Sequence, residues 1–244
     1  MSKHARPSRV VCLVPSLTEA IAATDRSLLV GATNWCTYPP DLDVARVGGT
    51  KWPDLDAVRT LHPDLVVANA EENRTEDLAA LRRSGIPVWV TGPASVAHGI
   101  DSLSALLRAL TGDEPDWLCR TRQVWQAVVP IVPRRHAIIP IWRRPWMVLG
   151  RDTFAGDVLR RLGVDNVFDS HRERYPRVEL HDERMAAADL VVLPDEPYAF
   201  GTDDGPEAFP DKPTALVSGR HLTWYGPSLL EAPEVLQAQL SSHW

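Results

Sequence analysis

Two acidic residues follow the same four-residue phrase, one in each half of the chain. The phrase Asp-Leu-Val-Val begins at Asp64 and again at Asp189, and a glutamate follows at the same offset, as Glu71 and Glu196. Paired carboxylates can do acid–base work when their environments differ. A carboxylate at the mouth of a binding site instead attracts cationic or hydrogen-bond-donating groups. The repeat therefore indicates either catalytic acids or polar anchors for a ligand.

Further polar residues stand where a binding site could use them. The polar candidates are Ser16, Glu71, Glu72, Asn73, Arg74 and Arg143. Ser16 opens a predicted helix, whose first amides could receive an anionic or carbonyl group. The commoner role of Ser16 or Thr18 at that place is a helix cap. A guanidinium at Arg143 could bind a carboxylate or a phosphate.

Aromatic residues also follow the predicted strands. The aromatic candidates are Trp35, Tyr38, Trp52, Trp142, Trp146, Trp224 and Tyr225. A single tryptophan is more often a core residue, because burying an indole is strongly favourable. Their shared position at strand ends nevertheless favours a surface on which a flat ligand stacks.

The catalytic and metal-binding motifs that are recognisable from sequence are missing. The chain contains no GxSxG, P-loop, HExxH or GxGxxG pattern, and its eight histidines are not at metal-ligand spacing. Roles in capping or at the surface suit His171 and His181 better than metal binding. We therefore predict no catalytic residue, no metal site and no required cofactor.

Strands that alternate with helices must position these candidates. The first phrase lies in a predicted strand, "HPDLVVAN", which a helix, "TEDLAALRRSG", and a second strand, "IPVWVTG", follow. The second half repeats the strands as "ADLVVLP" and "KPTALVSG". This alternation predicts an α/β fold of two Rossmann-like lobes with mainly parallel sheets.

The predicted lobes divide the chain into three parts. We expect an N-terminal α/β lobe over residues 1–111, a connecting helix within 112–133 and a C-terminal α/β lobe over 134–244. The helix is expected from Asp113 to Val129, since Pro115 suits a first turn and Pro130 ends the pattern. Ligands of parallel sheets bind beyond the carboxyl ends of the strands. If the lobes face each other, Glu71 and Glu196 approach one cleft from opposite sides.

Composition excludes several classes of partner. The formal net charge of −6 gives no reason to expect nucleic-acid binding. No apolar run approaches the ~20 residues of a membrane span, so we expect no membrane insertion. Three scattered cysteines and the lack of a recognisable signal peptide predict a cytoplasmic protein. A periplasmic or cell-surface location applies if Met1 is not the native start.

The order of several segments resembles the helical-backbone (class III) substrate-binding proteins of ABC importers, closest to their cobalamin-binding branch. The segments are "RVVCLVPSLTEAIAA", "YPPDLDVARVGG", "PDLDAVRTLHPDLVVAN", "GIPVWVTGP" and "TFAGDVLRRLGVDNVF". The resemblance runs from about Arg9 to Trp244. It implies two α/β lobes joined by one long helix, and a monomer that binds a metal chelate between the lobes without catalysis.

The resemblance also implies roles for particular residues. Aromatic side chains at Trp35 and near Trp52 would pack against a corrin ring. One acid per lobe would dock on the permease: Asp56 matches the first, whereas the second falls near His181, beside Asp182.

Three functions stay open at this point. The leading one is a binding protein for cobalamin, another corrinoid, a siderophore or a similar metal chelate, either with an ABC permease as partner or as a cytoplasmic relative detached from transport. The alternative is an enzyme in which Glu71, Glu72 and Arg143 supply acid, base and anchoring groups. The third is a protein-binding module without a small ligand.

Overall fold

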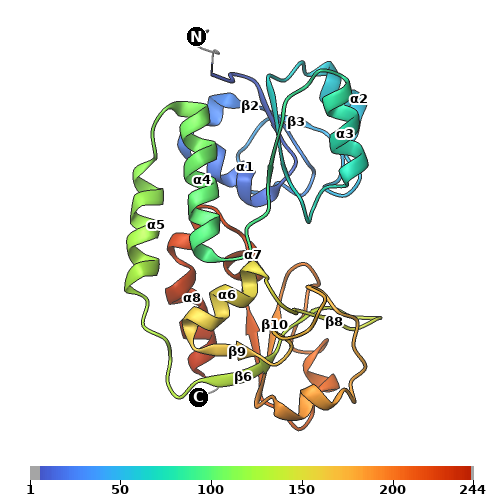
Figure 1. Cartoon of the computed structure of the whole chain (residues 1–244), viewed down its shortest axis with the longest axis vertical. Helices are drawn as coiled ribbons and strands as arrows, with labels where there is room; N and C mark the ends of the chain where they lie inside the picture. Colours follow the sequence, from blue (N-terminus) through green and yellow to red (C-terminus); the bar gives the residue numbers. More distant parts are fainter. Residues whose placement is uncertain (1–5, 243–244) are drawn as a thin grey trace. The chain divides into compact units, whose positions relative to one another are not determined.

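The computed structural model describes residues 6–242 and shows two compact α/β units (Figure 1). The first unit comprises the residues up to Gly92 together with Ile100–Cys119 and Tyr225–Pro227. The second comprises Pro93–Gly99, Arg120–Trp224 and the chain from Ser228 onward. The predicted class, α/β with mainly parallel sheets in two lobes, is confirmed.

The first unit is built on a five-stranded parallel sheet in the order β3-β2-β1-β4-β5. Its strands are β1 (Val10–Cys12), β2 (Leu29–Ala32), β3 (Ala45–Arg46), β4 (Leu65–Asn69) and β5 (Val88–Thr91). Its helices include α1 (Pro15–Asp25), η1 (Arg26–Leu28), α2 (Leu55–Thr60) and α3 (Thr75–Arg83). In Figure 1, α2 and α3 lie side by side on one side of the sheet and α1 lies on the other.

Two helices, α4 and α5, follow β5 in the chain. The expected helix is present as α5 (Asp116–Ala127) and is shorter than predicted at both ends. The preceding helix, α4 (Val96–Thr111), was not predicted. Both helices contribute residues to each unit. The assignment of a separate connecting segment over 112–133 stays a prediction.

The second unit repeats the sheet of the first with one strand fewer. Its four-stranded parallel sheet has the order β11-β10-β6-β9, with β7 and β8 as a separate antiparallel pair. The strands are β6 (Arg135–Ile138), β7 (Pro140–Trp142), β8 (Met147–Val148), β9 (Val164–Asn166), β10 (Leu190–Pro194) and β11 (Thr214–Val217). The helices are α6 (Phe154–Leu162), η2 (Glu183–Ala187), η3 (Pro206–Ala208), α7 (Gly219–Thr223), η4 (Pro227–Leu230) and α8 (Ala232–Ser241).

The repeated phrase occupies the same strand in both sheets. Strand β4 begins one residue after Asp64, and β10 begins one residue after Asp189. Each is fully buried and pairs on one side with the first strand of its half, β1 or β6. The order β2-β1-β4-β5 thus matches β9-β6-β10-β11 strand for strand. Glu71 and Glu196 therefore follow equivalent strands, as predicted.

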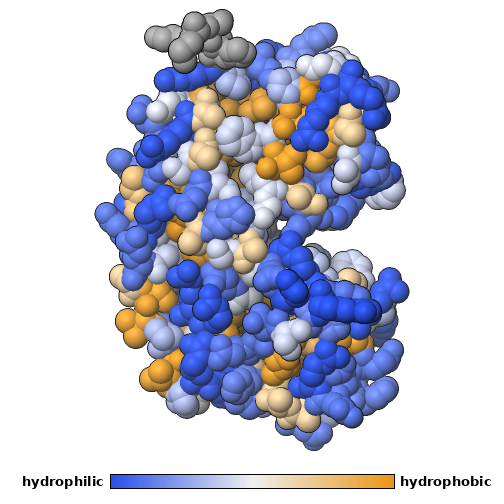
Figure 2. All heavy atoms as spheres, viewed as in Figure 1, coloured by the Kyte–Doolittle hydropathy of each residue, from blue (hydrophilic) through white to orange (hydrophobic). Residues whose placement is uncertain are grey.

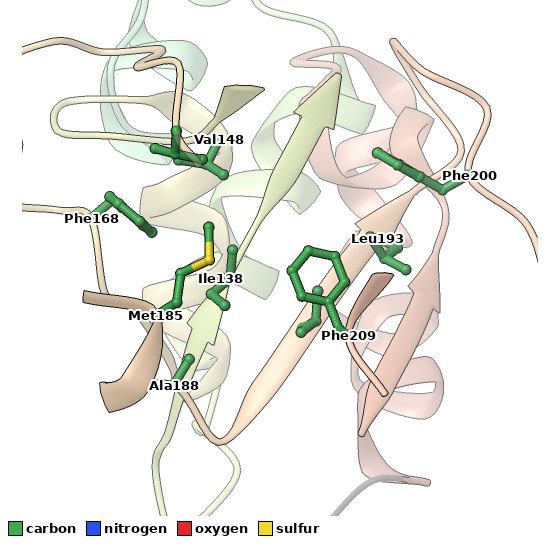
Figure 3. Packing of buried hydrophobic residues seen from close by; sticks show 10 residues of the cluster. Ile138, Val148, Phe168, Met185, Ala188, Leu193, Phe200 and Phe209 are labelled. Atoms are coloured by element: carbon green, nitrogen blue, oxygen red, sulfur yellow. The ribbon is translucent and has the colours of Figure 1, made fainter. Parts of the chain in front are cut away.

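Each unit has its own apolar core. The core of the second unit contains Ile138 of β6 and Leu193 of β10 with Phe168, Met185 and Phe209 (Figure 3). Valines of β1 and β4 pack with the buried leucines of α3 in the first.

Hydrophilic residues dominate the face of the molecule drawn in Figure 2, with smaller hydrophobic areas between them. Among residues 6–242, no helix combines the length and the apolar character that crossing a membrane would need.

Candidate functional site

A turn directly after β4 holds the first acid of the repeat. The main-chain N–H of Asn69 donates to Asn73 Oδ1 at 2.8 Å, and Asn73 N–H donates back to Asn69 O at 3.0 Å. Asn69 Oδ1 in turn accepts from the amides of Glu71, at 2.7 Å, and Glu72, at 3.3 Å. The side chain of an asparagine at a strand end commonly closes such a turn. The two glutamates are therefore fixed, half-buried, just beyond the carboxyl end of the sheet.

The loop 48–53, which carries Trp52, is attached to this turn. Asn73 Nδ2 donates to the carbonyl oxygen of Thr50 at 2.9 Å. Lys51 Nζ donates to the carbonyl oxygen of Glu71. Asn73 is buried, so its amide serves the turn and the loop and is not presented to a ligand. Asn73 thereby takes a structural role in which it sets the loop that bears the indole.

Three aromatic side chains of the first unit are exposed. Trp52 is 70% exposed, Trp35 is 68% exposed and Tyr38 is 40% exposed. The Nε1 atom of Trp35 lies 3.9 Å from the position that a Cβ on Gly49 would take, so this indole borders the loop of Trp52. Large aromatic side chains that are exposed next to one another often mark a site of interaction with a ligand or a partner. Trp35 and Trp52 are named here the aromatic rim.

The guanidinium of Arg74 contacts the Trp52 ring of the rim. Its guanidinium carbon lies 3.9 Å from the centroid of the Trp52 ring, which is cation–π geometry. The same guanidinium pairs with Glu76 and lies 3.9 Å from Asp77. Its charge is thus balanced by neighbouring carboxylates, and we assign it to holding the indole.

Ser16, in the first turn of α1, is buried against Gly226. A Cβ placed on Gly226 would lie 2.7 Å from the Ser16 carbonyl oxygen. No side chain caps the helix, which begins after Val14, and the hydroxyl of Thr18 donates to the Cys36 sulfur at 3.1 Å. The capping role expected for Ser16 or Thr18 is therefore not seen, and the ligand-binding role of Ser16 stays a prediction.

Tyr225 and Trp224 are buried, one in each unit. Tyr225 is 4% exposed, and its hydroxyl contacts Asn69 Nδ2 at 2.5 Å and Thr91 Oγ1 at 2.7 Å. Burial raises the pKa of the Tyr225 phenol, so it stays neutral. Trp224 Nε1 donates to Glu196 Oε2 at 3.0 Å. Burial likewise raises the pKa of Glu196. Both aromatic residues are therefore buried with their polar atoms hydrogen-bonded.

In the second unit Arg143 is held by acids. It forms ion pairs with Asp204 and Glu207 and is mostly buried. The hydroxyl of Tyr198 donates to Asp204 at 2.6 Å. Two carboxylates therefore already balance this guanidinium, which argues against its use as the anchor of an enzyme's acidic substrate. Trp142, which directly precedes Arg143, is 44% exposed. Its ring packs edge-on against that of Tyr198, with centroids 5.6 Å apart.

Trp146 is part of the core. Its ring is stacked with that of Phe200, with centroids 6.0 Å apart, and lies edge-on to Phe209 at 5.4 Å. It is partly buried and packs against the cluster around Ile138. Of the aromatic candidates in this unit, Trp142 is the one that presents a face to solvent.

The two acids expected to dock on a permease differ in their surroundings. The side chain of Asp56 projects from the first turn of α2, is 92% exposed and pairs with Arg59 at 2.6 Å. Asp182 caps η2 and accepts two hydrogen bonds from the Arg184 guanidinium, at 2.9 and 3.0 Å. Both acids thus pair with a neighbouring arginine, and Asp56 is the more exposed of the two. Their docking role stays a prediction.

Within residues 6–242, no cluster of three or more His, Cys, Asp or Glu side chains could hold a metal ion. Cys12 and Cys36 are both buried as free thiols, and burial raises the pKa of each.

Sequence reasoning missed two residues that organise the first unit, Asn69 and Thr91. They are register partners at the ends of β4 and β5. An asparagine that ends a run of buried apolar residues signals a side-chain-closed turn, so Asn69 was identifiable. Thr91 had no comparable signal, because its partner Tyr225 is 134 positions away.

Comparisons with known proteins bear on this fold. No family model matches the chain. A vitamin B12-binding protein of Vibrio cholerae is 23% identical over 209 residues, which are 82% of this chain and 75% of that protein. The crystal structure of the periplasmic vitamin B12 binding protein BtuF of Vibrio cholerae matches with a TM-score of 0.76 and 20% identity, over 98% of both chains. The periplasmic heme-binding protein RhuT from Roseiflexus sp. RS-1 matches with a TM-score of 0.80 and 20% identity, over 97% of this chain and 98% of that one. The resemblance stated from the sequence is thereby confirmed, and the chain has the class III substrate-binding fold of these periplasmic vitamin B12- and heme-binding proteins.

Proposed function

We propose that the chain is a non-catalytic binding protein whose ligand is a corrinoid or a similar flat metal chelate, and that the aromatic rim of the first unit contacts this ligand. The observation that carries the proposal is the pair of exposed indoles, Trp35 and Trp52, beyond the carboxyl ends of the sheet. The names of the relatives, which are vitamin B12- and heme-binding proteins, support the same class of ligand.

Covering the two indoles of the rim would contribute a large part of the free energy that micromolar binding needs, which is about 8 kcal/mol net. An indole buries roughly 150–250 Å² when fully covered. At about 25 cal/mol per Å², covering two rings that are about 70% exposed gives roughly 5–9 kcal/mol before the costs of association. Because the Trp52 ring is held by Arg74 and by the hydrogen-bonded loop 48–53, little of its share is lost to ordering the side chain.

Charge near the rim selects among flat ligands. Four carboxylates and two cations lie there: Glu71, Glu72, Glu76, Asp77, Lys51 and Arg74. An excess of acids disfavours anionic chelates such as ferric catecholates, and also porphyrins that carry free carboxylates. It favours a neutral or cationic ligand with hydrogen-bond donors, and the peripheral amides of a corrinoid are such donors. We therefore propose the corrinoid over the other chelates.

The proposal also covers the cellular location of the protein and its protein partner. The names of the structural relatives, which call them periplasmic, support a periplasmic location over a cytoplasmic one. We propose an ABC permease as partner, with the exposed Asp56 as a docking acid. Fractionation of the native host, followed with an antibody against this chain, tests the location. Crosslinking from Asp56→Cys in host membranes tests the partner.

A fluorescence titration tests the ligand class. The wild-type protein is titrated with cyanocobalamin, haemin and a ferric catecholate siderophore, and N-acetyltryptophanamide is titrated in parallel to correct for absorption by the ligand. We expect saturable quenching at micromolar concentration by cyanocobalamin, and weaker or no saturable quenching by the two anionic chelates. If none of the three quenches beyond the parallel titration, the proposal is wrong. If the anionic chelates bind tightly and cyanocobalamin does not, the charge argument is wrong.

A further inference from the structure

The dipeptide Trp224–Tyr225 reaches a strand-end turn in each unit. Trp224 belongs to the second unit and Tyr225 to the first. The Trp224 indole bonds Glu196, two residues beyond β10, and the Tyr225 hydroxyl bonds Asn69, the last residue of β4. Residues of the second unit precede and follow the stretch Tyr225–Pro227. A short C-terminal segment is thus built into the first unit directly behind the turn that carries Glu71 and Glu72.

The hydrogen bonds around Tyr225 run in one direction. The hydroxyl of Thr91 donates to the carbonyl oxygen of Ala68 at 3.2 Å, so its oxygen is left to accept from the Tyr225 hydroxyl at 2.7 Å. The Tyr225 oxygen is then the acceptor for Asn69 Nδ2. A hydroxyl at this place therefore favours the orientation of the Asn69 amide in which its nitrogen faces Tyr225.

With that orientation, the Asn69 oxygen faces the turn. Asn69 Oδ1 accepts from the amides of Glu71 and Glu72, and the main chain of Asn69 is bonded to Asn73. Asn73 in turn holds Thr50, in the loop of Trp52. A continuous series of hydrogen bonds thus leads from Tyr225 to both the glutamate turn and the rim loop.

Close packing holds the segment in place. A Cβ on Gly226 would lie 2.7 Å from Ser16 O and 3.3 Å from Glu19 Oε2. Tyr225 itself is buried. The hydroxyl therefore cannot turn toward water without displacing the segment from α1.

We propose that Tyr225 is a positioning residue. Its hydroxyl orients the Asn69 amide, and the amide fixes the Glu71–Glu72 turn in the shape that receives the ligand. The effect on the ligand rests on the proposed function, whereas the effect on the turn does not.

Amide hydrogen exchange tests the positioning role without any ligand. In Tyr225→Phe we expect the amides of Glu71 and Glu72 to exchange about five- to tenfold faster, because their acceptor is no longer held. The amide of Val66, bonded to Pro87 O within the sheet, is the internal reference and should not change. Trp125→Phe is the matched control, since it also removes a buried aromatic donor, Nε1 to Leu229 O at 2.8 Å, in the other unit.

Two further measurements separate positioning from general loosening. Thr91→Val leaves Asn69 its acceptor and should speed exchange at Glu71 and Glu72 less than Tyr225→Phe does. In the wild-type protein, the side-chain NH₂ of Asn69 should exchange slowly by NMR, a measurement that holds even if Tyr225→Phe fails to fold. Unchanged exchange at Glu71 and Glu72, equal acceleration at Val66, or a fast-exchanging Asn69 NH₂ each overturns the proposal.

Titration with cyanocobalamin as the probe then reads the effect on the ligand. We expect Tyr225→Phe to bind about fivefold more weakly than wild type, and Trp125→Phe to bind as wild type does. Unchanged affinity in Tyr225→Phe, in a wild type that binds, overturns the role toward the ligand. If wild type binds no cyanocobalamin while Tyr225→Phe loosens the turn, the proposed ligand is wrong and the positioning role stands.

Discussion

Asp64 and Asp189 accept hydrogen bonds from the main chain at the start of equivalent strands. Asp64 Oδ2 accepts from Arg9 N–H at 3.0 Å, and Asp189 Oδ1 accepts from His136 N–H at 3.0 Å. The main-chain N–H of Asp64 donates back to the carbonyl oxygen of Arg9, and that of Asp189 to the carbonyl oxygen of His136, both at 2.8 Å. The first letter of the repeated phrase therefore joins the central strands of each sheet, and this local requirement accounts for its recurrence.

Replacing either aspartate should destabilise its own unit. We expect Asp64→Ala and Asp189→Ala each to lower the free energy of unfolding by about 1 kcal/mol or more, because main-chain amides lose their acceptor. These amides are those of Ser8 and Arg9 for Asp64, and that of His136 for Asp189. Asp→Asn at either position keeps an acceptor oxygen and serves as the control. Urea unfolding followed by circular dichroism measures the change. Equal stability of the alanine and asparagine variants would contradict the role.

The stability of the second unit should fall in acid through Asp157. Burial alone would raise the pKa of this carboxyl, but hydrogen bonds from Arg161, the Val96 amide and Arg160 lower it overall. A carboxyl with a lowered folded pKa stabilises the native state fully above its unfolded pKa of about 4, and the contribution disappears as pH falls through the folded value.

The variant Asp157→Asn measures this contribution. At pH 7 we expect it to cost about 1–2 kcal/mol, discounted because Arg160 and Arg161 are partly exposed. The difference from wild type should shrink when urea unfolding is repeated below pH 4. A difference that is the same at pH 7 and pH 3 would show that the charge of Asp157 is not responsible.

The sign of the ligand's charge should determine the response to Glu71→Gln. The substitution keeps the side chain's shape and removes one negative charge from the rim. Binding of cyanocobalamin should weaken by about 1 kcal/mol, since a charged acceptor becomes a neutral one. Binding of haemin, which carries carboxylates, should strengthen or stay the same. Calorimetric titration of both ligands checks this, with Glu234→Gln, an exposed glutamate of α8 in the second unit, as the control. Parallel changes for the two ligands would contradict the prediction.

The fold was predictable because its signals are local. The buried runs that became β4 and β10 follow from their β-branched residues, and the helix α6 ends at Gly163, whose φ of 103° suits glycine. The missed helix α4 carries its apolar residues at helical spacing, with Leu103, Leu106, Leu107 and Leu110 buried. The helical signal of α4 is therefore present in the sequence, and it resembles that of α5, the predicted connecting helix.

The site was predictable in part, because burial is decided by distant partners. Trp35 and Trp52 follow strands and are exposed, as a ligand platform requires. Trp146 and Tyr225 follow the same rule in sequence, yet Trp146 packs into the core and Tyr225 is buried against Asn69, 156 positions away. Spacing along the chain cannot show which aromatic residue meets such a partner.

The measurement that tests the proposed function most directly is calorimetric titration of Trp35→Ala/Trp52→Ala with cyanocobalamin, beside wild type and Trp117→Phe. Trp117 is a tryptophan of α5 whose Nε1 donates to Thr24 Oγ1 at 3.2 Å, and it lies outside the rim. We expect the double variant to lose about 3 kcal/mol or more of binding free energy, roughly a hundredfold in Kd, while its thermal unfolding stays within a few degrees of wild type. An affinity equal to that of wild type, or a loss that Trp117→Phe shares, would contradict the assignment of Trp35 and Trp52 to the ligand.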